Sequence, residues 1–216
     1  MLNADRGLRV VVDAGDRHYV EGRDGSICLL ESFPEGGRTF FVTIPPGGQL
    51  LAEEPADREI LVLAGEIEAG GRLWPKGSYL RLEESIAPPA VREEGAYLFV
   101  KSGRFPEEDR RSLGIIPSDD RWSPGLVEGL SVFPLFSGGT ANTALVRWSP
   151  GTVFQPHRHF GGEEILVLSG VFEDEHGAYP EGTWYRAPHM SRHFPFSTGG
   201  CTIFVKTGHL LAASAA

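Results

Sequence analysis

The sequence is poor in cysteine, in long hydrophobic runs and in positive charge. Its 216 residues contain only two cysteines, Cys28 and Cys201, which excludes a disulfide framework or a four-cysteine zinc site. No apolar run resembles a secretory signal or a membrane span, so we expect a cytoplasmic protein that does not bind membranes. Twenty basic residues against 29 acidic ones give a net charge of −9. This charge argues against nucleic-acid binding, because that function needs a basic face.

Helical periodicity is also missing, since no stretch of about 12 residues shows apolar positions at helical spacing. The 28 glycines and 16 prolines are instead typical of many short strands joined by turns. β-Branched and aromatic runs predict strands at residues 38–44, 60–63, 97–100, 144–148, 165–168 and 202–205. The sequence therefore predicts an all-β protein built from sandwiches or barrels.

One sequence pattern occurs twice at a constant offset of 105 residues. Residues 59–65 read EILVLAG and residues 164–170 read EILVLSG, and FVKSG at 99–103 returns as FVKTG at 204–208. Comparing 26–103 with 131–208 gives 19 identities in 78 positions, where chance gives roughly five. We therefore predict two similar domains, residues 1–108 and 109–216, with a charged boundary at 106–112.

Histidine is concentrated in the second copy, where six of the seven lie after residue 150. His157 and His159 are two residues apart, so on a strand both imidazoles face the same side. Glu163 follows a two-glycine turn, and a later return strand would bring His193 alongside. Three imidazoles and one carboxylate suit an ion of zinc, iron, manganese, nickel or copper.

These residues resemble the two sequence motifs of the cupin family. The first motif, Gly-x5-His-x-His-x3-Glu-x6-Gly, is matched at every spacing by Gly151, His157, His159, Glu163 and Gly170. The second, Gly-x5-Pro-x-Gly-x2-His-x3-Asn, is matched by Gly182, Pro188 and His193, with Met190 in place of its glycine and Ser197 in place of its asparagine. Residues 122–208 as a whole are similar to the cupin domain of ChrR-type anti-sigma factors.

The resemblance implies two cupin barrels (jelly rolls, or double-stranded β-helices) in one chain, of which the first is degenerate. It implies one divalent metal ion in the C-terminal cupin, zinc by resemblance with iron, manganese and nickel left open. The ligands that it implies are His157, His159, Glu163 and His193. The equivalent positions of the first copy hold Ala52, Glu54, Arg58 and Pro88. We therefore expect no metal in the first barrel.

Two functions are compatible with this resemblance. The first is a metal-binding regulatory module that responds to a small molecule or an oxidant. The helical sigma-binding domain of the family has no counterpart in this sequence, so we do not expect direct sigma-factor binding. The alternative is a mononuclear metal-dependent dioxygenase acting on a small carbonyl or aromatic compound in the C-terminal barrel. A third reading gives the metal a structural role only, and a homodimer is left open.

Other side chains allow two interpretations each. His189 lies either at the pocket mouth or in a solvated loop. The only candidates for a general base are His189 and Glu164. Glu164 matches Glu59 of the metal-less copy, which favours a structural role. Cys201 on a predicted strand indicates a small buried hydrophobe. Four aromatic residues are either cavity walls or plain core: Phe154, Phe160, Trp184 and Tyr185.

Overall fold

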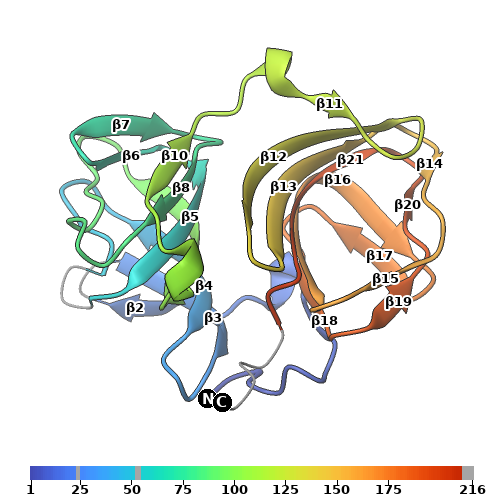
Figure 1. The fold of residues 1–216 in the computed structure, drawn as a ribbon. Helices are drawn as coiled ribbons and strands as arrows, with labels where there is room; N and C mark the ends of the chain where they lie inside the picture. Colours follow the sequence, from blue (N-terminus) through green and yellow to red (C-terminus); the bar gives the residue numbers. More distant parts are fainter. Residues whose placement is uncertain (23–24, 52–54, 211–216) are drawn as a thin grey trace. The chain divides into compact units, whose positions relative to one another are not determined.

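The computed structural model describes residues 1–22, 25–51 and 55–210 (Figure 1). These residues form β-strands and three single-turn 3-10 helices: η1 (Ala14–Asp16), η2 (Glu107–Asp109) and η3 (Asp119–Arg121). No helix in the described ranges is long and apolar enough to cross a membrane. The prediction of an all-β protein is confirmed.

The chain forms two compact units, one made of Met1–Ala4 and His18–Pro117, the other of Asp5–Arg17 and the chain from Ser118 onward. The first unit contains a seven-stranded antiparallel sheet and a two-stranded hairpin. The order in the sheet is β10 (Leu113–Ile115), β8 (Tyr79–Leu82), β5 (Asp57–Ala64), β9 (Ala96–Gly103), β4 (Arg38–Ile44), β3 (Gly25–Ser32) and β2 (Val20–Gly22). The hairpin pairs β6 (Glu66–Ala69) with β7 (Arg72–Pro75). Alternate residues of β4, such as Phe40, Val42 and Ile44, point into one apolar core, as the two-residue period of a strand requires.

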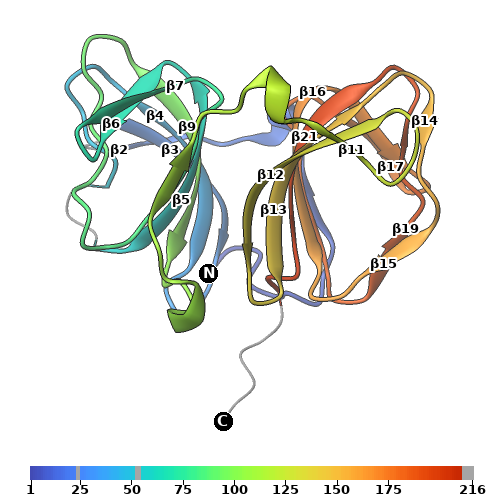
Figure 2. The same ribbon diagram turned by 45° about the horizontal axis from the view of Figure 1, so that its top comes forward.

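The second unit repeats this plan. Its main sheet runs β1 (Val10–Val12), β18 (Trp184–Ala187), β16 (Glu163–Asp174), β21 (Cys201–Thr207), β13 (Ala141–Trp148), β12 (Leu130–Gly138) and β11 (Ser123–Pro124). The shorter strands are β14 (Thr152–Val153), β17 (Gly177–Pro180) and β20 (Phe196–Ser197), together with the pair β15 (His157–His159) and β19 (Ser191–His193). Within this unit β15 and β19 lie across the barrel from β12 and β13 (Figures 1 and 2). The core between these walls is apolar and includes Trp148, Ile165 and Phe172.

The 105-residue repeat is visible in the strands themselves. β7 and β8 become β17 and β18 when 105 is added to their residue numbers. Gly65 and Gly170 take the same left-handed conformation, with φ of 68° and 72°. A Cβ at either glycine would lie 2.1 Å from a backbone oxygen, that of Gly95 or of Gly200. The duplicated sequence thus builds the same backbone twice.

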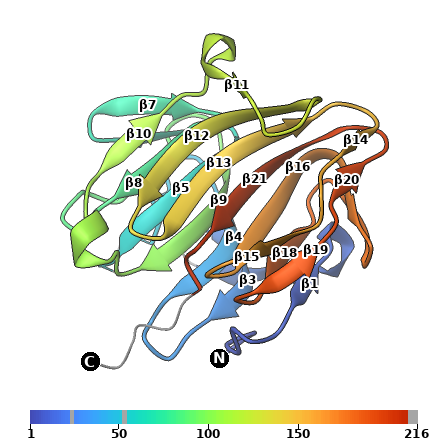
Figure 3. The same ribbon diagram turned by 45° about the vertical axis from the view of Figure 1, so that its right-hand side comes forward.

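The two units differ from a simple division of the chain into consecutive halves. β10, which follows the first repeat, pairs with β8 of the first unit, Leu113 opposite Arg81. β1, near the N-terminus, pairs with β18 of the second unit, Val10 opposite Arg186 (Figure 3). Residues 5–17 therefore pack in the second unit, and the first extends to Pro117 rather than ending at 108. The sequence did not indicate these exchanges, because the repeat begins only at residue 26. In addition, the strand with which an edge strand pairs is not encoded in its own sequence.

Candidate metal centre

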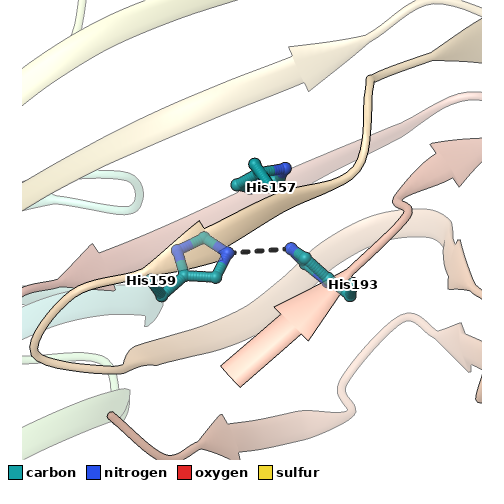
Figure 4. A group of neighbouring side chains, drawn as sticks. All are labelled: His157, His159 and His193. Atoms are coloured by element: carbon teal, nitrogen blue, oxygen red, sulfur yellow. Dashed lines mark hydrogen bonds between the residues drawn. The ribbon is translucent and has the colours of Figure 1, made fainter. Parts of the chain in front are cut away.

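The three histidines are placed by one short antiparallel strand pair. β15 and β19 align His157 with His193 and His159 with Ser191. Because side chains alternate along a strand, His157 and His159 face the same side, toward His193 (Figure 4). The predicted return strand that brings His193 alongside is present.

A tight turn brings Glu163 to the same point. Gly161 and Gly162, which separate it from β15, both have positive φ, 74° and 75°. A Cβ on Gly161 would lie 2.6 Å from the Gly208 Cα, and one on Gly162 would lie 2.9 Å from the Ala187 oxygen. Only glycine fits both positions, and the turn allows β16 to begin with Glu163 beside the histidines.

The donor atoms of the four residues converge. The Nε2 atoms of His159 and His193 are 2.9 Å apart (Figure 4). Glu163 Oε2 lies 3.4 Å from His159 Nε2 and 3.5 Å from His193 Nε2. One ring nitrogen from each of His157, His159 and His193 lies within 4.8 Å of the other two. Two ligand atoms about 2.1 Å from one ion are about 3.0 Å apart when they are at right angles, so the distances among His159, Glu163 and His193 fit one divalent ion. His157 lies beside these three residues.

Neighbouring groups orient these donors. His157 Nδ1 lies 3.0 Å from the carbonyl of Gln155, and His193 Nδ1 lies 3.5 Å from Asp174 Oδ2, so both rings have Nε2 available to a ligand. The Tyr185 hydroxyl donates a hydrogen bond of 2.8 Å to Glu163 Oε2. Partners of this kind fix ring orientation and tautomer in metal sites.

Asp174 is in turn held by the N-terminal segment. Arg9 Nη2 is 3.1 Å from Asp174 Oδ2, whose side chain is fully buried. Asp174 Oδ1 accepts hydrogen bonds from the backbone N–H groups of His176 and Gly177 and from the Tyr179 hydroxyl. A chain of contacts thus connects Arg9, beside β1, to the ring of His193.

Burial and charge act in opposite directions on these groups. Burial lowers the pKa of His159 despite the nearby Glu163 carboxylate. Burial acts in the same direction on His193, but the Asp174 and Glu163 carboxylates outweigh it and raise the pKa of that imidazole. Burial alone would raise the pKa of Asp174, yet its contacts with His193, His176 and Tyr179 lower the pKa to about 2. Asp174 is therefore an anion at neutral pH.

A cavity of about 200 Å³ opens onto the site. His157, Glu163 and His193 contribute to its wall, and the other lining residues are apolar. Of the four aromatic residues considered from the sequence, Phe154 lines this cavity. The sequence analysis missed three large contributors to the cavity wall, which come from β12, β13 and β16: Leu130, Trp148 and Phe172. The sequence indicates that these side chains point to the inside of a strand pair. That pattern does not distinguish a residue that lines a cavity from one in the packed core.

The other sequence candidates lie away from the cavity. His189 is exposed, accepts a hydrogen bond from the Gly161 N–H at 2.9 Å and packs on the 61 % exposed Phe160. Glu164 points to the other face of β16, where it accepts from Trp184 Nε1 and contacts His209 Nε2. Neither His189 nor Glu164 lines the cavity, so neither supports the general-base hypothesis.

The first unit shows no counterpart of this cluster in its described residues. Arg58, opposite Glu163 in the repeat, is buried and donates to the carbonyls of Ala56 and Leu51. Pro88 carries no donor atom for a metal, and Ala52 and Glu54 lie outside the described residues. The one group of three or more metal-ligating side chains found among the described residues is that of the second unit.

Several solved structures have the same fold as this chain. A structure from Nostoc punctiforme PCC 73102, provisionally named a dioxygenase, has a TM-score of 0.73 at 18% identity, covering 97% of this chain and 85% of that one. Salicylate 1,2-dioxygenase from Pseudoaminobacter salicylatoxidans gives a TM-score of 0.66 at 9% identity, with coverages of 94% and 81%. Bacillus subtilis oxalate decarboxylase, which has Mn(II) centres, gives 0.61 at 14% identity, with coverages of 94% and 78%.

A sequence search of curated proteins finds no match. Residues 111–211, which contain all four proposed ligands, match the model of the ChrR cupin-like domain. The structural neighbours have the cupin fold, so the expected fold class is confirmed. Residues 111–211 are thus similar to the ChrR cupin-like domain, and the whole chain has the two-barrel cupin fold.

Proposed function

We propose that the second barrel binds one divalent metal ion through His157, His159, Glu163 and His193. The support is that one ring nitrogen from each histidine lies within 4.8 Å of the others, and that Glu163 Oε2 lies 3.4 and 3.5 Å from two of these rings. This donor set suits zinc, iron, manganese or nickel and leaves coordination positions for a further ligand when the ion is six-coordinate.

The proposed function of this centre is metal-dependent oxygenase chemistry on a small organic molecule. The observation that carries this proposal is the cavity of about 200 Å³ that reaches Glu163, His157 and His193. A structural ion needs no such space beside it. A bound ion of iron or manganese would supply activation of oxygen or of the substrate.

The protein side chains contribute positioning and the exclusion of water. Tyr185 fixes the Glu163 carboxylate by its hydrogen bond, and Asp174 faces the ring of His193. Trp148, Phe154 and other apolar side chains surround the space where a substrate would lie. Such a wall strengthens electrostatic interactions at the site because water is largely displaced.

The second candidate function is a regulatory module, and it is favoured by the match of residues 111–211 to the ChrR cupin-like domain. In this alternative the centre binds zinc, and a small molecule or an oxidant changes the state of the barrel. The same four ligands serve both candidates. Metal identity and oxygen consumption separate them.

Elemental analysis of the purified protein tests the metal site. We expect about one ion per chain in the wild type and almost none after His157→Ala combined with His193→Ala, because two of the proposed ligands are lost. His176→Ala is the matched control, since His176 lies at an exposed position of the same unit. Unchanged metal content in the double variant would show that the ligand assignment is wrong.

Oxygen uptake then separates the two functions. The iron-loaded protein should consume oxygen with at least one compound of a panel of small carbonyl and aromatic compounds. Background uptake with every compound, together with zinc in the protein as purified from its native host, would reject the oxygenase and leave the regulatory module.

A further inference from the structure

The wall of the cavity divides sharply into the metal-binding end and an apolar remainder. The only lining residues with polar side-chain atoms besides the Trp148 indole are His157, Glu163 and His193. Aliphatic and aromatic side chains form the rest, among them Leu130, Val146, Phe154, Ile165, Phe172 and Ile203. A molecule in this space contacts the proposed metal ligands at one end and carbon elsewhere.

Cationic side chains of the same strands are absent from this wall. On β13 the lining residues Val146 and Trp148 alternate with Arg147, which pairs with Asp119 on the surface. On β21 Val205 lines the cavity and the next residue, Lys206, points to the other face. In the described part of the second unit no arginine or lysine lines the cavity.

This distribution of charge selects against anionic ligands. A carboxylate or phosphate in the apolar part would lose its hydration without gaining a counter-charge, and that loss is costly. Among the described side chains of that part of the wall, the Trp148 indole N–H is the one hydrogen-bond donor. An apolar group in the same place gains the hydrophobic effect over its whole buried surface. The only compensation for a negative charge lies at the metal end.

The size of the space sets a second limit. A cavity of about 150 Å³ lined by aliphatic and aromatic side chains is large enough for benzene. The cavity of about 200 Å³ therefore accommodates one six-membered ring with a small substituent or an aliphatic chain of similar bulk.

We propose that the second barrel binds an uncharged small molecule, one ring or its aliphatic equivalent, that presents oxygen to the metal and hydrocarbon to the remaining wall. This inference rests on the proposed metal centre. It narrows the small carbonyl or aromatic compounds considered above to those without a carboxylate or other anionic group remote from the metal.

Two para-substituted phenols test the proposal on the metal-loaded protein. 4-Methylphenol and 4-hydroxybenzoate have the same hydroxyl group, but one has a methyl group where the other has a carboxylate. Trp148 lines the cavity and is one of four tryptophans, so a change in tryptophan fluorescence that is lost in Trp148→Phe reports binding of either probe without any need for turnover. We expect 4-methylphenol to bind about tenfold more tightly or better, because 4-hydroxybenzoate buries a polar group in the apolar wall in either orientation. That group is its carboxylate when the hydroxyl faces the metal, and its hydroxyl when the carboxylate does.

A charge introduced at the rim provides a matched variant. Leu126 lines the cavity yet is 86 % exposed, so Leu126→Arg adds a cation without disturbing the core. We expect this variant to bind 4-hydroxybenzoate up to about fivefold more tightly than wild type, the effect expected of an ion pair at an exposed position. Leu126→Gln, which adds bulk and polarity without charge, should leave the preference unchanged.

The outcomes separate this inference from the metal assignment when metal content is measured on the same samples. A protein with one metal ion that binds the acid as tightly as the phenol, or that binds no phenol, overturns the inference and leaves the metal centre intact. A protein without metal refutes the proposed centre itself. Preference for the phenol that Leu126→Arg narrows and Leu126→Gln leaves unchanged supports the assignment of the cavity wall.

Discussion

Replacing Arg9 by alanine tests whether the N-terminal segment supports the metal centre. The substitution removes the guanidinium that lies 3.1 Å from Asp174 Oδ2 and over the rings of Tyr179 and Tyr185. The backbone pairing of β1 with β18 begins at Val10 and is retained. The variant therefore measures the contribution of the Arg9 side chain without disturbing the pairing of β1.

The magnitude follows from the burial of the two partners. Breaking a fully buried ion pair by removing one partner costs about 3–5 kcal/mol. Arg9 is 27 % exposed, and Asp174 keeps three hydrogen bonds to Oδ1, so we expect about 2 kcal/mol for Arg9→Ala. For a domain of about this size that loss lowers the melting temperature by roughly 10 °C.

Metal binding should respond as well, because Asp174 faces Nδ1 of His193. Asp174→Asn exchanges the acceptor Oδ2 for a donor and should weaken zinc binding by about tenfold, as is usual for outer partners of metal-ligating histidines. Arg9→Ala should have a smaller effect in the same direction. Thermal unfolding followed by circular dichroism and zinc titration calorimetry measure the two effects.

The control is Arg147→Ala, which breaks an exposed pair with Asp119 in the same unit and should cost less than about 1 kcal/mol. A double-mutant cycle of Arg9→Ala and Asp174→Asn should show a coupling of about 1–2 kcal/mol. Additive single effects, or a loss for Arg9→Ala no larger than that for Arg147→Ala, would refute the reasoning.

Three other substitutions or reactions test the backbone and the core. Met190 is 44 % exposed and has a left-handed φ of 61°, a backbone conformation that is strained for a residue with a Cβ. Met190→Gly should therefore raise the free energy of unfolding by about 0.5 kcal/mol, measured by thermal unfolding. A loss of stability in this variant would contradict the proposed backbone strain. Gly170→Ala places a Cβ 2.1 Å from the Gly200 oxygen and should lower the free energy of unfolding by about 3 kcal/mol or more. Gly199→Ala is the control, because a Cβ there lies in open space and should change stability little. Equal effects of the two substitutions would disprove the steric argument. Cys201 is buried, and burial raises the pKa of its thiol to about 11. The thiol should therefore react with a thiol reagent at pH 8 only after denaturation. Immediate labelling of Cys201 in the native protein would be inconsistent with this burial.

Local sequence information was sufficient for the architecture and for the grouping of candidate ligands. The constant 105-residue offset predicted two similar β units, and the strands β7, β8, β17 and β18 reproduce that offset. His157 and His159 were predicted to share a face because strand side chains alternate with period two. Gly161 and Gly162 marked the turn that returns the chain to Glu163, since only glycine adopts that backbone without strain.

Only the tertiary structure determined which distant segments meet. Val10–Val12 form a strand whose pairing with β18 in the second unit depends on an edge that local sequence does not specify. The contact of Arg9 with Asp174 follows from that pairing. The cavity likewise combines side chains from several strands, and its empty volume is a property of their packing together. Periodicity and motifs act over a few residues and are encoded locally, whereas strand partners, buried ion pairs and cavities depend on the whole fold.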